Sequence, residues 1–600
     1  MDTTRITGIA SGMDTESLVK GLMKAERAKV DKLYQSQQTA LWKQEQYNEA
    51  NKDFANFILD SKKDLELSKS LSNGMLVGNS ISKLSWVKKA SSSDEDILTT
   101  KASAEGMTGI HKIKVKELAE GVSAVSTSAV MKGAEIATAN TKLSEIQNGV
   151  SVDSPYVTFK ILVDGEEKDV KVSYSKDDTI KELVKKINYA TTDDGDPDTS
   201  ETSLGIKANF DSTTGRLFLS TKKTGSKQQI KISKDTGNLF TGDNKLHVQV
   251  KHADDSMHDL AIDTAVTGKD ASIDFNGATN LKYESNNINI NGIELSLEAI
   301  GDATVKVDTD VDSVYEKIKG FVAKYNELIE KMNKKVSEKR YRDYQPLTKE
   351  QKESMKEDDI KLWEQKAKSG LLRNDEYMND ILLTARTGLY EEVEGVTSKY
   401  NQLTNIGITT DTWKSKGKLV IDERKLKEAI IDDVDGTLEL LFKSPSNEEK
   451  ISISTALKEE WETSKGKTYE EFTESEKKEY KIAYDKKIRS NTGLVNRMFD
   501  DMTQGMKKII DKAGPGDDKE LYRNVKSDIL IDFVTGGNGR KGSISLLDED
   551  VLDYDKRIKN EEDRLTRLEQ AYWKKYTAME TALSKMQSQS SWLAGQSGSM

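Results

Sequence analysis

Apolar residues recur every seven positions near both ends of the chain. In the N-terminal segment this row consists of Leu33, Ala40, Tyr47 and Phe54. Between Asp14 and residue 67 the only glycine or proline is Gly21. The Asp14 side chain can accept hydrogen bonds from the first amides of a helix. The pattern therefore predicts one long amphipathic helix, or two in tandem, from about residue 14 to residue 67.

The C-terminal segment has a longer row with the same spacing: Val551, Ile558, Leu565, Tyr572, Met579, Met586 and Leu593. Three residues further on, the companion row includes polar residues such as Glu561 and Lys575. A two-stranded coiled coil that is stable alone has apolar residues in both rows. We therefore expect this helix to need a partner, most simply the N-terminal helix of the same chain. The candidate assembly seam consists of Leu33, Tyr47, Phe54, Ile558, Leu565, Leu568, Tyr572, Met579 and Met586.

The hydrophobic period changes to two in the region between these helices. Residues 157–163 and 170–174 alternate on either side of an Asp-Gly pair, and residues 288–290 and 293–297 alternate on either side of an Asn-Gly pair. Both patterns predict β-hairpins. The stretch from about residue 90 to 307 is therefore predicted to be β-rich and to form two small domains.

Helical patterns occur at three other places. Thr179 and Glu182 form a capping box that predicts a short helix. Residues 311–332 carry apolar side chains on one helical face, which predicts a longer helix. Residues 445–490 are densely charged and are interpreted as a solvated helical insertion.

These elements predict an α+β multidomain fold, with terminal coiled-coil helices from both chain ends, a helical leg domain and inserted β-rich head domains. The expected boundaries are residues 1–58 with 556–600 for the coiled coil, 59–90 with 308–555 for the leg, 91–250 for the first β head domain, and 251–307 for the second β head segment.

Composition narrows the possible functions of the 600-residue chain. Its formal net charge is −11, opposite in sign to the basic field of a typical nucleic-acid binder. The absence of cysteine excludes disulfides, thiol nucleophiles and cysteine-ligated metals. The four histidines have no metal-site spacing, and no phosphate-binding or nucleophile motif occurs. We therefore expect no catalytic, metal or cofactor site, and no enzyme activity.

The sequence shows neither a signal peptide nor a membrane span. Residues 1–19 lack a basic segment followed by an apolar one, and no stretch approaches the roughly 18 apolar residues that a spanning helix requires. These rules alone predict a soluble cytoplasmic protein, unless export uses a signal that they do not cover.

The order of short motifs along the whole chain resembles that of flagellar cap proteins, the flagellar hook-associated protein 2 family. The motifs include ITGIASGMD at residues 6–14, LMKAE at 22–26, YNELI at 325–329 and MQSQS at 586–590. Residues 179–188 and 205–219 are similar to the inserted β repeat of flagellins. The charged segment at 445–490 does not match the family pattern.

The resemblance implies a structural protein at the tip of the bacterial flagellum. A homo-oligomeric ring, expected to be a pentamer, would cap the filament and promote the insertion and polymerisation of exported flagellin. The implied partners are flagellin, the hook–filament junction protein and a cytosolic export chaperone, without nucleic acid or membrane insertion. Export would use the flagellar type III channel, without a cleavable signal peptide.

Two other functions are compatible with the sequence pattern. Other flagellar axial proteins, such as flagellin or a junction protein, also pair their terminal helices around β domains. A surface adhesin could use the many Asn, Asp and Thr residues of the β head to bind a glycan or a host protein, and adhesion could coexist with capping. The motifs at residues 6–14 and 325–329 favour the cap protein.

Overall fold

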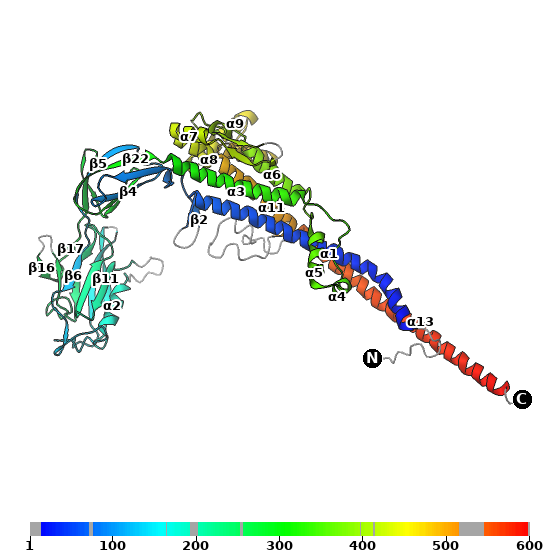
Figure 1. Ribbon diagram of the computed structural model, residues 1–600. Helices are drawn as coiled ribbons and strands as arrows, with labels where there is room; N and C mark the ends of the chain where they lie inside the picture. Colours follow the sequence, from blue (N-terminus) through cyan, green and yellow to red (C-terminus); the bar gives the residue numbers. More distant parts are fainter. Residues whose placement is uncertain are drawn as a thin grey trace. The chain divides into compact units, whose positions relative to one another are not determined.

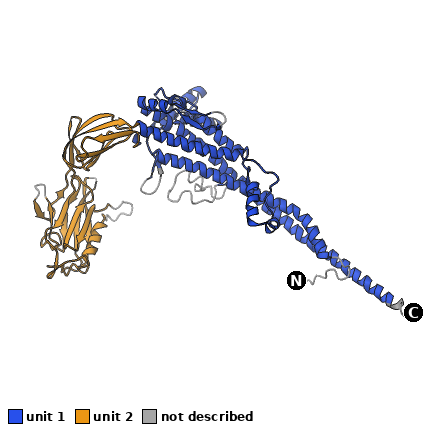
Figure 2. Cartoon of the chain, viewed as in Figure 1, with its two compact units in different colours: residues 1–84, 311–600 blue, residues 85–310 orange. Residues whose placement is uncertain are grey.

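The computed structural model describes residues 14–70, 76–163, 165–192, 202–251, 256–396, 398–411, 415–514 and 545–597. The chain divides into two compact units (Figure 2). The helical unit contains residues 1–84 and 311–600, and the β unit contains residues 85–310. The predicted α+β class is therefore confirmed. Most of the predicted motif at residues 6–14 lies outside the described residues.

The helical unit contains two long helices that come from opposite ends of the chain. The first begins where the sequence predicts, because the Asp14 side chain accepts a hydrogen bond from the amide of Ser17 at 3.0 Å. It is a single helix rather than two in tandem. The described helices of this unit are α1 (Thr15–Asp64), α3 (Val311–Ser337), α4 (Lys349–Glu353), α5 (Glu357–Lys368), α6 (Glu376–Gly388), α7 (Glu423–Asp432), α8 (Val434–Phe442), α9 (Asn447–Lys465), α10 (Glu474–Ser490), α11 (Leu494–Ala513) and α13 (Leu546–Ser597).

The second half of α1 packs against α3 and α11 (Figure 1). An aromatic cluster marks this core: the ring centroid of Phe57 lies 5.9 Å from those of both Phe321 and Phe499. Two antiparallel hairpins complete the unit, formed by β1 (Ser68–Ser70) with β2 (Leu76–Gly78) and by β23 (Ile408–Thr410) with β24 (Leu419–Ile421).

Arg497 is a completely buried cation that holds three segments of the helical unit together. Its guanidinium donates to the backbone carbonyls of Glu392, Ser490 and Thr492 at 3.0–3.3 Å. Burying a charge is costly unless the surrounding groups satisfy it. The carbonyls therefore compensate the buried charge, and Arg497 fixes the loop after α6 and the end of α10 to α11.

The charged insertion at 445–490 is helical, as predicted. It consists of α9 and α10, whose first turns are closed by capping boxes. A small aromatic cluster joins the two helices, with 5.8 Å between the ring centroids of Trp461 and Tyr480. At its base Arg489 forms an ion pair with Asp501 at 2.7 Å. The insertion thus has a small core of its own and a fixed attachment to α11.

The β unit contains two separate hydrophobic cores. One belongs to what we call the split β domain, residues 85–120 and 269–310, in which two sheets have the strand orders β19-β18-β5-β22-β3 and β20-β21-β4. Its strands are β3 (Lys88–Ser92), β4 (Leu98–Ala102), β5 (Gly109–Glu117), β18 (Ala271–Phe275), β19 (Ala278–Tyr283), β20 (Asn287–Ile290), β21 (Ile293–Leu297) and β22 (Gly301–Thr309).

The inserted β domain, residues 121–268, holds the second core. Its main sheets have the orders β11-β12-β6-β15-β16 and β10-β9-β14. The elements of this domain are β6 (Ser123–Ser126), β7 (Met131–Lys132), β8 (Glu135–Ile136), β9 (Tyr156–Val163), β10 (Glu166–Ser173), α2 (Ile180–Asn188), β11 (Ile206–Asp211), β12 (Arg216–Thr221), β13 (Gln229–Ile230), β14 (Ile232–Asp235), β15 (Val248–Lys251), β16 (Met257–Asp259) and β17 (Val266–Thr267).

Both predicted hairpins and the capping box are present. Strands β9 and β10 pair in a regular antiparallel register, and Thr179 and Glu182 cap α2 reciprocally. Asn291 and Gly292 between β20 and β21 have φ of 48° and 78°. Two successive positive φ values define the tight turn that matches the twist of paired strands, which explains the Asn-Gly sequence.

The division of the β unit differs from the predicted boundary at residue 250. The sequence placed β5 in a first domain, but β5 pairs with β18 and β22, which lie more than 150 residues later. The inserted β domain therefore interrupts the sequence of the split β domain, and the two domains do not follow one another along the chain. Local periodicity identifies strands and hairpins, but it does not specify which distant strands pair.

The nested arrangement predicts that the inserted β domain can be removed. Glu120 and Lys269 exchange two backbone hydrogen bonds of 2.9 Å, which is the geometry on either side of a two-residue hairpin turn. A fragment of residues 85–310 in which 121–268 is replaced by Asn-Gly should therefore fold. Circular dichroism should show β structure and a cooperative thermal transition.

The matched control is the fragment 91–250, which keeps β5 but lacks β18 and β22. It should fail to show a cooperative transition for the split β domain. If this fragment folds normally while the excised variant is unfolded, the nested division is wrong.

Candidate assembly interface

The first half of α1 runs antiparallel to α13 (Figure 1). Polar side chains link the two helices at four places. All four links join side chains that lie more than 500 positions apart in the sequence. They are Gln44–Asp548 at 2.8 Å, Gln37–Asp555 at 2.6 Å, Tyr34–Glu562 at 2.8 Å and Glu26–Arg564 at 2.7 Å. Because the links are specific in position, they fix the register of the pair.

A small apolar cluster lies between these polar links. Val30, Ile558 and Leu565 are buried in it, and Met23 and Leu33 pack against them. The cluster is short compared with the lengths of the two helices. The pair therefore combines a short apolar cluster with hydrogen bonds and an ion pair near the surface.

The structure divides the nine predicted seam residues into three groups. Leu33, Ile558 and Leu565 meet in the apolar cluster. Leu568, Tyr572 and Met579 are half-buried on α13, and Met586 is exposed. Tyr47 and Phe54 are fully buried, but on the part of α1 that packs within the core of the helical unit. As a continuous functional seam, the nine residues remain a prediction.

Val30, Gln37 and Gln44 contact α13 and were not among the predicted residues. They lie seven apart on α1, in the row beside Leu33, Ala40 and Tyr47. A search for two adjacent heptad rows would have found this companion row. It was missed because two of its members are glutamines rather than apolar residues.

Residues 338–370, which we call the strap, leave the end of α3 and return to the same point. The Arg340 guanidinium donates to the carbonyls of Ala367 and Ser369, and the Gly370 amide donates to the Glu338 carboxylate at 2.9 Å. The strap therefore forms a loop with a closed base that contains α4 and α5.

The strap and the start of α6 hold the middle of α1. Gln35 donates to the carbonyl of Pro346 and Gln46 to that of Lys368, each at 2.9 Å. Tyr47 donates to the Asp375 carboxylate at 2.5 Å. Burial raises the pKa of the Tyr47 hydroxyl most, and the hydrogen bond to Asp375 raises it further. The hydroxyl therefore keeps its proton and acts as the donor. These contacts fix α1 where its partners change from α13 to the core.

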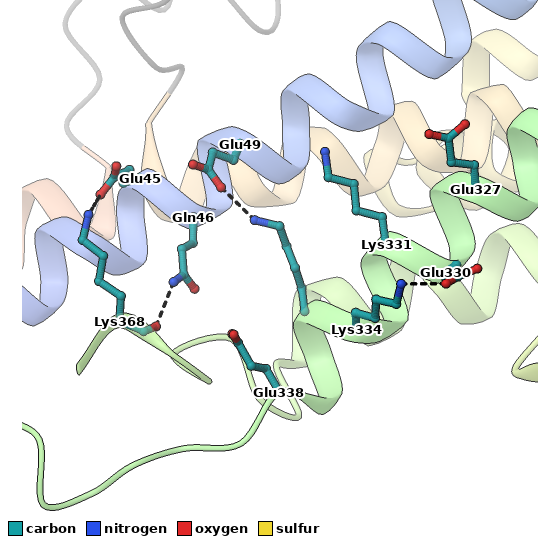
Figure 3. A pocket seen from close by; sticks show the side chains of 10 residues that line it. Glu45, Gln46, Glu49, Glu327, Glu330, Lys331, Lys334, Glu338 and Lys368 are labelled. Atoms are coloured by element: carbon teal, nitrogen blue, oxygen red, sulfur yellow. Dashed lines mark hydrogen bonds and ion pairs between the residues drawn. The ribbon is translucent and has the colours of Figure 1, made fainter. Parts of the chain in front are cut away.

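A groove of about 680 Å³ lies between α1 and α3 next to the strap (Figure 3). Its lining contains only Glu, Gln and Lys residues, most of them paired: Lys335 with Glu49 at 2.8 Å, and Lys368 with Glu45 at 2.9 Å. Hydrogen bonds from Lys334 and Lys418 lower the pKa of Glu330 to about 2. The opposite charges that line the groove pair with one another across the two helices. The lining contains no nucleophile with an adjacent base.

Among the residues that the structure describes, no group of three His, Asp or Glu side chains is placed to hold a metal ion. His111 is buried, with ring nitrogens 2.7 Å from the Met107 carbonyl oxygen and 2.9 Å from the Asn276 side-chain nitrogen. It has a packing role. His252, one of the four histidines, lies outside the described residues. No helix among the described residues is both long and apolar enough to cross a membrane.

Comparison with protein families gives matches at both ends of the chain. The model of the flagellar hook-associated protein 2 C-terminus matches residues 268–588, and that of the N-terminus matches residues 11–121. The first of these covers more than half of the chain. The chain belongs to the flagellar hook-associated protein 2 family. The flagellin hook IN motif also matches residues 158–223, within the inserted β domain.

Individual hook-associated protein 2 sequences show the same relation. The flagellar hook-associated protein 2 of Halalkalibacterium halodurans is 28% identical over 597 residues, which cover 98% of each chain. The A-type protein of Pseudomonas aeruginosa is 25% identical, covering 72% of this chain and 79% of its own. A crystal structure of the Escherichia coli flagellar cap protein FliD, domains D1-D2-D3, is 19% identical with a TM-score of 0.41, covering 66% of this chain and 90% of that one.

The apolar cluster predicts that Leu565 is essential for the outer α1–α13 pair of the helical unit. Truncating a buried Leu costs about 2–5 kcal/mol, and Leu565→Asp adds the cost of burying a carboxylate. Hydrogen exchange should accelerate at residues 19–40 and 555–575, with the β unit unchanged. The control is Leu552→Asp on the same helix, because Leu552 is 47% exposed. Equal protection in both variants would show that the cluster does not hold the pair.

The Tyr47–Asp375 contact predicts a second, independent effect. Tyr47→Phe leaves a largely buried carboxylate without its hydroxyl donor, which should cost about 1–3 kcal/mol of stability in the helical unit. Urea unfolding followed by helical circular dichroism measures this cost. Tyr377→Phe is the matched control, since it keeps the edge-to-face ring contact with Tyr47. An unchanged midpoint for Tyr47→Phe would contradict the role assigned to the contact between α1 and the start of α6.

Proposed function

We propose that the protein caps the distal end of the bacterial flagellar filament and promotes the insertion and polymerisation of exported flagellin. Family membership carries this proposal, because one family model spans residues 268–588 and a full-length relative aligns over 98% of both chains. The Escherichia coli relative is described as a flagellar cap protein. The role is structural and requires no catalytic site.

The proposed domain roles follow the elements of the chain. Residues 1–58 with 556–600 would form the terminal coiled coil that contacts the filament, and residues 59–90 with 308–555 would form the leg. The β unit would form the head. Of the alternatives, the family models favour the cap over other axial proteins, while adhesion through the β head has no specific observation in its support.

We propose a homo-oligomeric ring as the working form, with a pentamer as the expected copy number. Flagellin, the hook–filament junction protein and an export chaperone are the proposed partners. Capping requires contacts that break each time a subunit is added. The α1–α13 pair fits this requirement, because its links include surface hydrogen bonds and an ion pair, which contribute little individually.

The proposal predicts a filament defect from seam substitutions. In the source bacterium, Leu565→Asp with Met579→Asp should leave the β unit intact but produce short or absent filaments, with monomeric flagellin in the culture medium. Electron microscopy and blotting of the medium measure both effects. Leu552→Asp is the control that should support filaments of normal length, and blotting the medium for each variant checks its export.

Labelling shows directly where on the filament the protein is located. An epitope-tagged wild-type protein should be found at filament tips and not along their length. Labelling along the filament, or full-length filaments from an exported double variant, would contradict the cap function.

A further inference from the structure

The strap is closed tightly at its base, where its two ends meet. Arg340 donates to the backbone carbonyls of Ala367 and Ser369, and the Ser369 hydroxyl donates to the carbonyl of Lys339 at 2.7 Å. Gly370 has a φ of 68°, and a Cβ atom on this residue would lie 2.8 Å from the backbone nitrogen of Arg340. Glycine alone accommodates both this φ and this close approach. The two ends of the strap are therefore fixed against each other.

Beyond the base, the strap has a small core and an ion pair of its own. The Trp363 indole donates to the carbonyl of Gln345 at 2.8 Å, and its ring centroid lies 4.6 Å from that of Tyr344. An ion pair of 2.6 Å joins Lys352 on α4 to Glu364 on α5. Because these contacts connect both helices of the strap, we expect α4 and α5 to move as one body.

This body buries little against the rest of the helical unit. Every residue of α4 and α5 is described by the structure, and the one that is buried is Ala367, next to the base. The large apolar side chain of Leu362 on α5 is 61% exposed. Local opening costs least where few buried contacts must break. The strap therefore combines a fixed base with a body that can separate from its neighbours at low cost.

The contact between this body and α1 is narrow. Pro346, just before α4, is buried, and its carbonyl accepts the hydrogen bond from Gln35. Two residues further along α1, Gln37 donates to Asp555 of α13. Side chains two positions apart on a helix point about 200° away from each other. At this level α1 is therefore held between the strap on one side and α13 on the other.

Two carboxylates of like charge oppose the contact at Pro346. A second groove, of about 1060 Å³, is lined by α1, α13 and residues 346–350, with Asp31 on α1 and Glu350 on α4 among its lining residues. Burial raises the pKa of Asp31 most; the positive charge of Arg27 lowers it, and the negative charge of Glu350 raises it. Neighbouring carboxylates repel each other when both are ionised. The repulsion favours release of the strap from α1.

We propose that the strap acts as a latch on α1: α4 and α5 swing away from α1 as one body about the closed base, and their position sets how far the α1–α13 pair can open. With the strap in contact, opening from the start of α1 ends at Gln35. With the strap released, opening extends to Glu45, which stays paired with Lys368 at the base. The inference does not depend on the cap function, because it concerns contacts within one chain.

A disulfide that locks the strap tests the proposal, because the natural chain has no cysteine. Positions 35 and 347 both line the second groove, so the full-length chain with Gln35→Cys and Leu347→Cys carries one thiol on each side of the contact. Backbone hydrogen exchange at residues 35–44 should be slower in the oxidised than in the reduced form by about two- to tenfold, the range expected for one hydrogen bond. Residues 50–64, in the core, should exchange alike in both forms.

The single variant Gln35→Cys is the control for oxidation and for loss of the glutamine. It should exchange at residues 35–44 like the reduced double variant, whether or not it has been oxidised. If the locked and reduced forms exchange alike at these residues, the strap does not limit opening of the pair and the inference is wrong.

A charge reversal gives a second test that needs no cross-link. Glu350→Lys replaces the repulsion of Asp31 by an attraction, so exchange at residues 35–44 should slow by about two- to fivefold, as expected for one exposed ion pair. Glu353→Lys is the matched control, because it makes the same change of charge on α4 at a position outside the groove lining. Exchange that is not slower in Glu350→Lys, or that slows equally in both variants, would contradict the proposal.

A double-mutant cycle assigns the effect to the two carboxylates. Exchange at residues 35–44 is compared in Asp31→Asn, Glu350→Gln and the double variant, with the circular dichroism of each checked against the natural chain. The two changes should not be additive, because either one alone removes the repulsion. Additive effects would show that Asp31 and Glu350 do not interact across the contact, and the charge-driven release of the strap would be wrong.

Discussion

The helical unit depends on α1, because this one helix forms contacts with two different sets of partners. Its first half pairs with α13, from the other end of the chain, and its second half is buried against α3 and α11. The strap contacts α1 at Gln35 and Gln46, on either side of this change of partners. Any movement of α1 along its axis would therefore disturb the core, the strap and the terminal pair together.

The two halves of α1 differ in the physical character of their contacts. Around Tyr47, Phe54 and Phe57 the side chains are buried among aromatic and aliphatic groups, whose removal from water stabilises the unit by an amount proportional to area. Around Tyr34 and Glu26 the contacts are solvent-exposed polar links, which contribute little individually and weaken with salt. The contacts of the first half thus specify a register and can break reversibly, whereas the contacts of the second half hold the core of the helical unit together.

Much of this structure follows from local signals in the sequence. Asp14 caps the start of α1, Asn291-Gly292 forms the turn between β20 and β21, and the capping box at Thr179 begins α2. Each of these features was predictable because it depends on residues only a few positions apart. The pairing of β5 with β18 and β22 was not predictable in this way, since the partners are specified by burial across long distances in the sequence.

The candidate interface was predicted less completely than the fold. A heptad row shows that a helix face is buried, but it does not show by what. Leu33 and Tyr47 occupy the same row, yet one contacts α13 and the other lies in the core of the unit. The glutamines at positions 37 and 44 contact α13 through hydrogen bonds, which a search for apolar residues does not detect.

Along α13 the same heptad row passes from burial to exposure. Ile558 and Leu565 are buried against α1, Tyr572 and Met579 are half-buried, and Met586 and Leu593 are open to solvent. Because local opening costs least where few apolar contacts must break, the exposed end of α13 should open first, while the pair remains closed near the strap. A protein that must release and regain contacts at a growing end needs this order, since its terminal helices can exchange partners there while the core of the helical unit stays folded.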